Sequence, residues 1–88
     1  MNTNLTLYEL NSQYIINYAI KSLKKTFVQI NALNVIKVEP STEKQGYFCV
    51  TLGCDTTKKT YIITVSMKNS LEQLLNSLNL ALETLTNR

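Results

Sequence analysis

The sequence contains no histidine and no tryptophan, and it has only two glycines, two cysteines and one proline among 88 residues. Histidine is the usual side chain for acid–base catalysis near neutral pH, and together with cysteine it supplies most zinc ligands. Two glycines, Gly46 and Gly53, are too few for a glycine-rich phosphate-binding loop. The standard routes to catalysis and to a bound metal or nucleotide are therefore missing. We expect a protein that is not an enzyme and that has no cofactor.

The cysteines and the acidic residues add no sign of reactive chemistry. Cys49 and Cys54 are not spaced as a CxxC pair, and we interpret them as small side chains within strands. The acidic residues are scattered at no spacing that predicts a shared site: Glu9, Glu39, Glu43, Asp55, Glu72 and Glu83. We expect these carboxylates to be solvated surface charges.

Long apolar runs and a basic leader are also missing. Unbroken apolar stretches are only a few residues long, so no helix is expected to span a membrane and no membrane partner is expected. The first ten residues, MNTNLTLYEL, lack the basic start and the apolar core of a secretory signal. We therefore expect an intracellular, cytoplasmic protein. Its 88 residues are enough for one domain, spanning 1–88.

A first helix is predicted for residues 12–30. Apolar side chains recur there at steps of three and four residues, which places them on one stripe of a helix. This stripe consists of Ile16, Ala19, Ile20, Leu23, Phe27 and Ile30. The helix is expected to end within residues 31–34, because asparagine tolerates the left-handed conformation found at helix ends.

Two positions are open for the start of this helix. Either Asn11 or Ser12 can act as the N-cap, because each side chain can accept a hydrogen bond from a free backbone N–H. Residues 3–10 fit a short strand by their alternation, but Thr6 and Glu9 also stand at the spacing of a capping box. We favour the helix for this segment.

A second helix is predicted for residues 70–86. Its apolar stripe is wide and rich in leucine, as is typical of a helix packed on a core. The stripe consists of Leu71, Leu74, Leu75, Leu78, Ala81, Leu82 and Leu85. Ser70 and Gln73 stand at capping-box spacing, and Asn69 with Glu72 is a second candidate pair.

Three strands are predicted between the helices, at residues 34–39, 47–53 and 60–67. The first is rich in β-branched side chains and the other two alternate apolar and polar residues. Short loops join them, which favours an antiparallel meander. We therefore expect an α+β two-layer fold of the order α-β-β-β-α, with both helices on one sheet face. The inward face is expected to consist of Ile36, Val38, Phe48, Val50, Leu52, Tyr61, Ile63, Val65 and Met67.

Two helices of nearly 20 residues are expected to overhang a three-stranded sheet and to leave apolar side chains uncovered. At about 25 cal/mol per Å² of apolar area, two or three exposed leucines forgo several kcal/mol, which is comparable to the whole stability of a small domain. A partner removes that cost. We therefore expect a non-catalytic protein-interaction module, either a homodimer or a small subunit or inhibitor of a larger complex. The expected contact residues are Leu78, Leu82 and Leu85 in the second helix, with Tyr47 and Ile62 on the open sheet face.

RNA binding is the second hypothesis, because the net charge is +3 and the pI is near 9.0. The candidate lysines are Lys21, Lys24, Lys25, Lys58 and Lys59. The order of elements over residues 12–86 resembles that of double-stranded-RNA-binding domains and of the signal recognition particle's Alu-binding subunits, and more loosely that of kinetochore globular heads. The first two resemblances imply an RNA partner. Double-stranded-RNA-binding domains usually open their last helix with several basic residues, where this chain has Lys68 alone. The hypothesis requires the five lysines to converge on one side.

Overall fold

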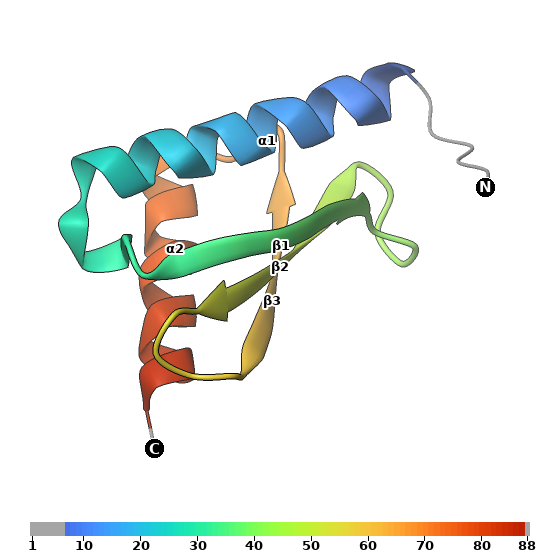
Figure 1. The fold of residues 1–88 in the computed structure, drawn as a ribbon. Helices are drawn as coiled ribbons and strands as arrows, with labels where there is room; N and C mark the ends of the chain where they lie inside the picture. The colour runs from blue at the N-terminus through green and yellow to red at the C-terminus, as the bar shows by residue number, and fades with distance from the viewer. Residues whose placement is uncertain (1–6, 88) are drawn as a thin grey trace.

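The computed structural model describes residues 7–87, and its elements follow the predicted order α-β-β-β-α (Figure 1). The elements are α1 (Leu7–Thr26), a 3-10 turn η1 (Val28–Ile30), β1 (Leu33–Pro40), β2 (Tyr47–Cys54), β3 (Thr60–Ser66) and α2 (Leu71–Thr86). The three strands pair antiparallel in the order β1-β2-β3, so the predicted meander is confirmed. None of the helices within residues 7–87 combines the length and the apolarity needed to cross a bilayer.

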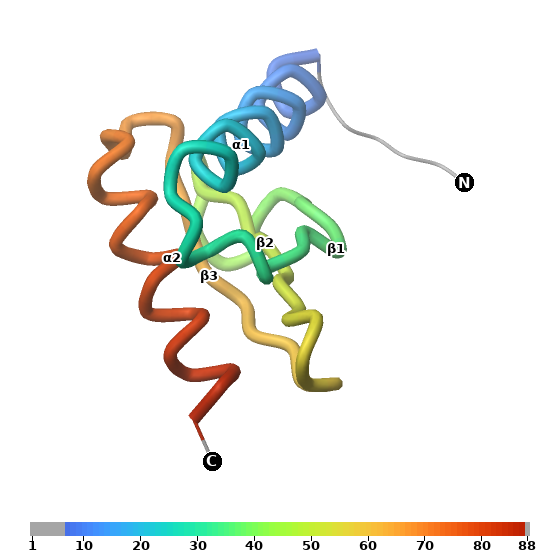
Figure 2. The backbone as a smooth tube through the Cα atoms, turned by 60° about the vertical axis from the view of Figure 1, so that its left-hand side comes forward, coloured from blue at the N-terminus to red at the C-terminus, as the bar shows by residue number. Residues whose placement is uncertain are grey.

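One face of the sheet carries the core. Phe48 lies opposite Val65 and Val50 lies opposite Ile63, so alternate residues of β2 and β3 point to the same side. Both helices supply buried side chains to this face. In Figures 1 and 2, α1 runs across one end of α2, while α2 runs along the sheet. The buried hydrophobic residues of the helices are Ile16, Ile20, Leu23, Leu74, Leu78, Ala81 and Leu85.

The prediction that Ile36 points inward is wrong, because β1 contains a bulge. Val35 pairs with Leu52, but Lys37 pairs with the next residue, Thr51, so Ile36 is an extra residue in the strand. The extra residue breaks the two-residue period and turns Ile36 to the open face, where it is 56% exposed. Its Cδ1 atom lies 3.2 Å from the position that a Cβ atom on Gly53 would occupy, so this glycine makes room for it.

The first helix begins five residues earlier than residue 12 and ends at Thr26. Asn11 and Ser12 are therefore not caps but lie inside α1, and Ser12 is buried. The preference for helix is confirmed for residues 7–10, while residues 3–6, with Thr6 of the proposed capping box, lie outside the described residues. Residues 28–30, predicted to continue this helix, instead form the tighter turn η1.

The start of α2 follows the predicted capping box. The Ser70 hydroxyl accepts a hydrogen bond from the Gln73 N–H at 3.1 Å, and the Gln73 side-chain oxygen accepts one from the Ser70 N–H at 2.8 Å. Two backbone donors that the helix leaves free are thereby satisfied. Asn69 bonds elsewhere, since its side-chain oxygen accepts from the Ser66 N–H. The capping box fixes where α2 begins, beside the middle of α1.

Candidate functional site

The predicted contact residues of α2 lie mainly in the core. Leu78 and Leu85 are 0% and 2% exposed, and Leu82 is half-buried and packs against the same core. α2 contacts both β3 and β2, and its apolar stripe is buried at Leu74, Leu78, Ala81 and Leu85, whereas Leu71 in the first turn is exposed. The interpretation of Leu78 and Leu85 as surface residues that contact a partner is therefore corrected.

The open sheet face carries the other predicted pair, but the two residues lie apart. Ile62 is 58% exposed and pairs with Thr51, whereas Tyr47 is half-buried at the far end of the same face. Tyr47 and Thr51 are four residues apart on β2, which is about 13 Å along a strand. The Lys44 ammonium lies 4.8 Å from the centre of the Tyr47 ring and partly covers it. Tyr47 and Ile62 thus do not form one apolar patch.

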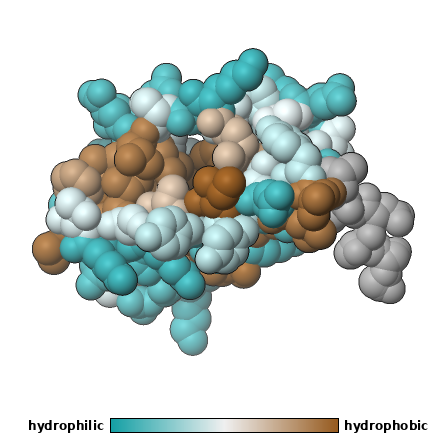
Figure 3. Space-filling view, turned by 90° about the horizontal axis from the view of Figure 1, so that it is seen from above, coloured by the Kyte–Doolittle hydropathy of each residue, from teal (hydrophilic) through white to brown (hydrophobic). Residues whose placement is uncertain are grey.

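Among the described residues, the largest group of exposed apolar side chains lies on α1, from the side turned away from the core round to the flanks beside α2 and the end of the β1–β2 hairpin. Tyr14 and Tyr18 each precede a buried isoleucine, Ile16 or Ile20, by two residues, which is a rotation of about 200° around a helix. The group, here called the α1 outer face, consists of Leu7 (75% exposed), Tyr8 (59%), Leu10 (49%), Tyr14 (73%), Ile15 (48%) and Tyr18 (65%). Figure 3 looks onto the molecule from above and shows hydrophobic side chains exposed among paler ones.

This surface was missed from the sequence, although a signal is present. Leu7, Leu10, Tyr14 and Tyr18 recur at steps of three and four residues, which makes a second stripe beside the core-facing one. A helix that is apolar on two opposite sides is normally covered on both of them. Among the described residues, only one side of α1 is covered by the sheet and α2.

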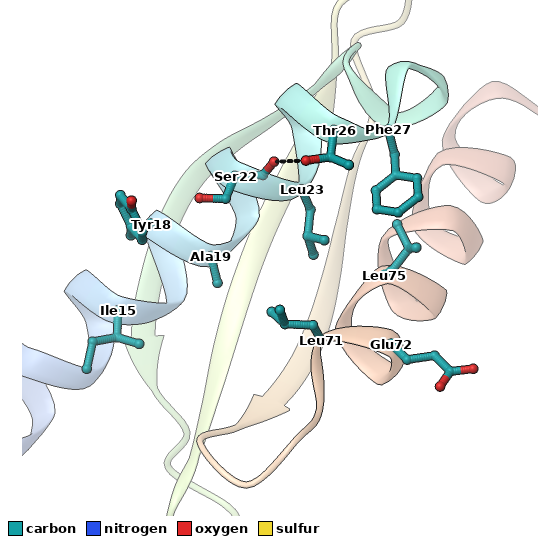
Figure 4. Close-up of a pocket in the computed structure, with 10 residues that line it drawn as sticks. All are labelled: Ile15, Tyr18, Ala19, Ser22, Leu23, Thr26, Phe27, Leu71, Glu72 and Leu75. Carbon is teal, nitrogen blue, oxygen red and sulfur yellow. Dashed lines mark hydrogen bonds between the residues drawn. The ribbon is translucent and has the colours of Figure 1, made fainter.

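An apolar groove adjoins the α1 outer face, between α1 and the first turns of α2. Its volume is about 680 Å³. In Figure 4, Leu71 and Leu75 of α2 lie across the groove from Leu23 and Phe27, and Glu72 points away from it. The remaining lining residues are Ile15, Tyr18, Ala19, Ser22 and Thr26.

The surface that lines this groove is mostly apolar. The Thr26 hydroxyl donates a hydrogen bond to the Ser22 carbonyl at 3.1 Å, so it is already paired within the helix. Ile15 and Tyr18 belong both to the groove and to the α1 outer face, which makes the two one continuous surface. Such a surface is suited to apolar side chains rather than to a charged or polar ligand.

A smaller hollow separates α1 from the free edge of β1. Two features of this edge oppose the pairing of a further strand with β1. The Gln13 side-chain nitrogen donates a hydrogen bond to the Val38 carbonyl at 2.8 Å, which occupies an acceptor on the edge. The bulge at Ile36 interrupts the regular spacing of the edge as well. Both devices are common protections against unwanted pairing. The Asn17 side-chain oxygen beside them has no hydrogen-bond partner among the described residues.

The five lysines predicted for RNA binding do not form one patch. Lys59 lines a hollow with Leu85 and Thr86, at the C-terminal end of α2. The lysine-bearing end of α1 lies at the other end of α2, where Ser22 and Thr26 share the groove with Leu71. The 16 residues of α2 span about 24 Å. Lys21, Lys24 and Lys25 are therefore far from Lys58 and Lys59.

The thiol of Cys54 lies at the end of β2, away from the α1 outer face. The Cys54 sulfur lies 3.3 Å from the Thr56 hydroxyl, and this hydrogen bond lowers the pKa of the buried Cys54 thiol. Within residues 7–87, no three histidine, cysteine, aspartate or glutamate side chains gather as ligands for a metal ion. No protein-family model, no curated protein and no solved structure is similar enough to this chain to count as a match.

Proposed function

We propose that this chain is a non-catalytic protein-interaction domain, which binds its partner with the α1 outer face and the adjoining groove. Exposure of six large apolar side chains on one helix is the observation that carries the proposal. Their exposed fractions together correspond to nearly four whole side chains. At about 200 Å² for a large side chain, the exposed area is on the order of 700 Å². The largest apolar patch on a typical monomer is about 300–600 Å² and is often functional.

The energy of covering this area is of the same order as the cost of association. At about 25 cal/mol per Å², burial contributes on the order of 15 kcal/mol, and association costs roughly 4–15 kcal/mol in lost freedom. Tyr14 and Tyr18 are the expected centres of the contact. Tyrosine is enriched at protein interfaces, because its ring buries a large area while its hydroxyl stays hydrated at the rim.

The same domain is expected to work in a reducing, cytoplasmic compartment. Cys49 and Cys54 are both free thiols, which supports such a compartment. Within it, the domain acts either as a homodimer or as a small subunit or inhibitor of another protein.

Capture of the partner tests the assigned surface. The chain is purified from its native host under mild conditions, and the partner identified there is then produced pure and titrated against variants. Tyr14→Glu combined with Tyr18→Glu is expected to weaken binding at least tenfold, because both charges fall inside the contact. Both side chains are well exposed, so the substitutions leave the fold intact.

Ile62→Glu is the matched control, since Ile62 is 58% exposed and lies on the open sheet face. It is expected to leave binding unchanged. Loss of binding with Ile62→Glu but not with the tyrosine variant moves the contact to the sheet and contradicts the assigned surface. Captured material that is nuclease-sensitive, and lost on replacing Lys21, Lys24 and Lys25, contradicts the proposed function in favour of RNA binding.

A further inference from the structure

We propose that the partner is a second copy of this chain, with the two α1 helices packed antiparallel about a two-fold axis near Tyr14. This inference rests on the proposed function, because it uses the same surface. It adds the identity of the partner and the relative orientation of the two α1 helices.

The exposed area matches what a dimer needs. A specific protein interface of standard size buries about 800 Å² on each partner. The α1 outer face alone offers on the order of 700 Å² at about 200 Å² a side chain. The groove beside it adds Leu71, which is 62% exposed. One copy therefore carries a complete half of a symmetric interface.

Shape complementarity favours a second copy over a flat contact. A two-fold axis brings the same surface from both copies together, so that surface must contain both projecting and hollow parts. Leu7 and Tyr14 project, with 75% and 73% of their surfaces exposed, and the groove of about 680 Å³ is the hollow. The α1 outer face and groove meet this requirement.

Helix geometry brings these parts to the same level along the paired helices. Leu7 is seven residues before Tyr14, about 10 Å along the helix, and Ser22 in the groove lining is eight residues after it, about 12 Å. In an antiparallel pair centred on Tyr14, Leu7 of one copy therefore arrives level with the groove of the other. The same contact occurs twice.

Charge selects the antiparallel orientation. Lys21 and Lys25 lie on α1 beyond Tyr18, towards its C-terminal end. Parallel helices would bring each lysine beside its own counterpart, whereas antiparallel helices move the two sets to opposite ends of the contact. Each copy still carries a net charge of +3, so the copies repel at long range. Added salt screens this repulsion and is expected to strengthen the dimer.

Sedimentation equilibrium over micromolar to submillimolar concentrations tests the inference. The wild-type chain is expected to approach twice its mass of 10.0 kDa, more readily at high salt. Tyr14→Glu with Tyr18→Glu is expected to weaken dimerisation at least tenfold, and Ile62→Glu is expected to leave it unchanged. Circular dichroism checks that each variant is folded.

Orientation is tested by oxidation of single-cysteine variants in a chain that carries both Cys49→Ser and Cys54→Ala. Tyr14→Cys is expected to form a disulfide-linked dimer much faster than Lys25→Cys, because only Tyr14 lies near the axis. Fast oxidation of both variants indicates a parallel pair and overturns the arrangement.

Two other results overturn the second copy as partner. One is a wild-type chain that stays monomeric throughout, and partner capture then still decides whether the chain binds another protein. The other is a monomer that binds anionic lipid vesicles through the same tyrosines, which assigns the surface to a membrane. Dimerisation that is lost only with Ile62→Glu also contradicts the proposed surface.

Discussion

Leu78 provides the sharpest test of how the core is assembled. Its side chain is 0% exposed and belongs to the cluster shared by both helices and the sheet. Leu78→Ala removes its outer atoms and leaves a cavity, which costs about 3–5 kcal/mol when a leucine is fully buried. A domain of this length is expected to have a total stability of about 4–13 kcal/mol. The substitution therefore removes a large part of the folding free energy.

Leu80→Ala is the matched control, because it is the same substitution on the same helix. Leu80 is 55% exposed, so this variant is expected to change stability by no more than about 0.5 kcal/mol. Urea unfolding is followed by circular dichroism at one fixed protein concentration. With a slope of about 1–3 kcal/mol per molar urea, the midpoint of Leu78→Ala is expected to fall by on the order of 2 M.

Equal midpoints for the two variants would refute the packing of α2 described above. A Leu78→Ala chain that keeps its full stability but loses its partner would restore Leu78 as a contact residue. The comparison thus separates a core role from an interface role at a single position.

Three further predictions concern local features. Ser70→Ala is expected to cost about 1 kcal/mol by removing the α2 cap, and Ser70→Gly only a few tenths; equal losses in thermal unfolding would contradict the cap. Gly46 has φ +86, so Gly46→Ala is expected to cost about 1–2 kcal/mol in urea unfolding, and a neutral result would contradict the left-handed turn. The hydrogen bond to Thr56 lowers the pKa of Cys54, so the folded state favours the thiolate. The stability that the Cys54 thiolate contributes is present above the unfolded-state pKa of the thiol and is lost as the pH falls through its folded-state pKa. The stability advantage of wild type over Cys54→Ala is therefore expected to grow towards alkaline pH. A stability difference that does not change with pH would contradict the hydrogen bond to Thr56.

Much of the fold follows from local patterns in the sequence. The alternation in 47–53 and 60–67 predicts which residues of β2 and β3 face the core, and the capping box at Ser70 predicts the start of α2. These signals are reliable because they depend on neighbours in the chain. The bulge at Ile36 has no such signal, since a run of β-branched residues reads as a regular strand whether or not one residue is extra.

The candidate surface was harder to predict, because exposure is a property of tertiary packing. Periodicity shows which residues share a stripe, but it does not show whether the sheet or a partner covers that stripe. Leu78 and Leu85 share the single stripe of α2, and the sheet covers it. Tyr14 and Tyr18 form a second stripe on α1, and only the position of α1 across the end of α2 leaves that stripe exposed.

Photo-crosslinking in the native host tests the central claim most directly, namely that the α1 outer face is the contact surface. Benzoylphenylalanine replaces Tyr18 in one chain and Ile62 in another, since both positions are well exposed and lie on different faces. Illumination is expected to give a protein adduct from position 18, at twice the chain mass if the partner is a second copy, and little from position 62. Adducts from position 62 alone would contradict the claim.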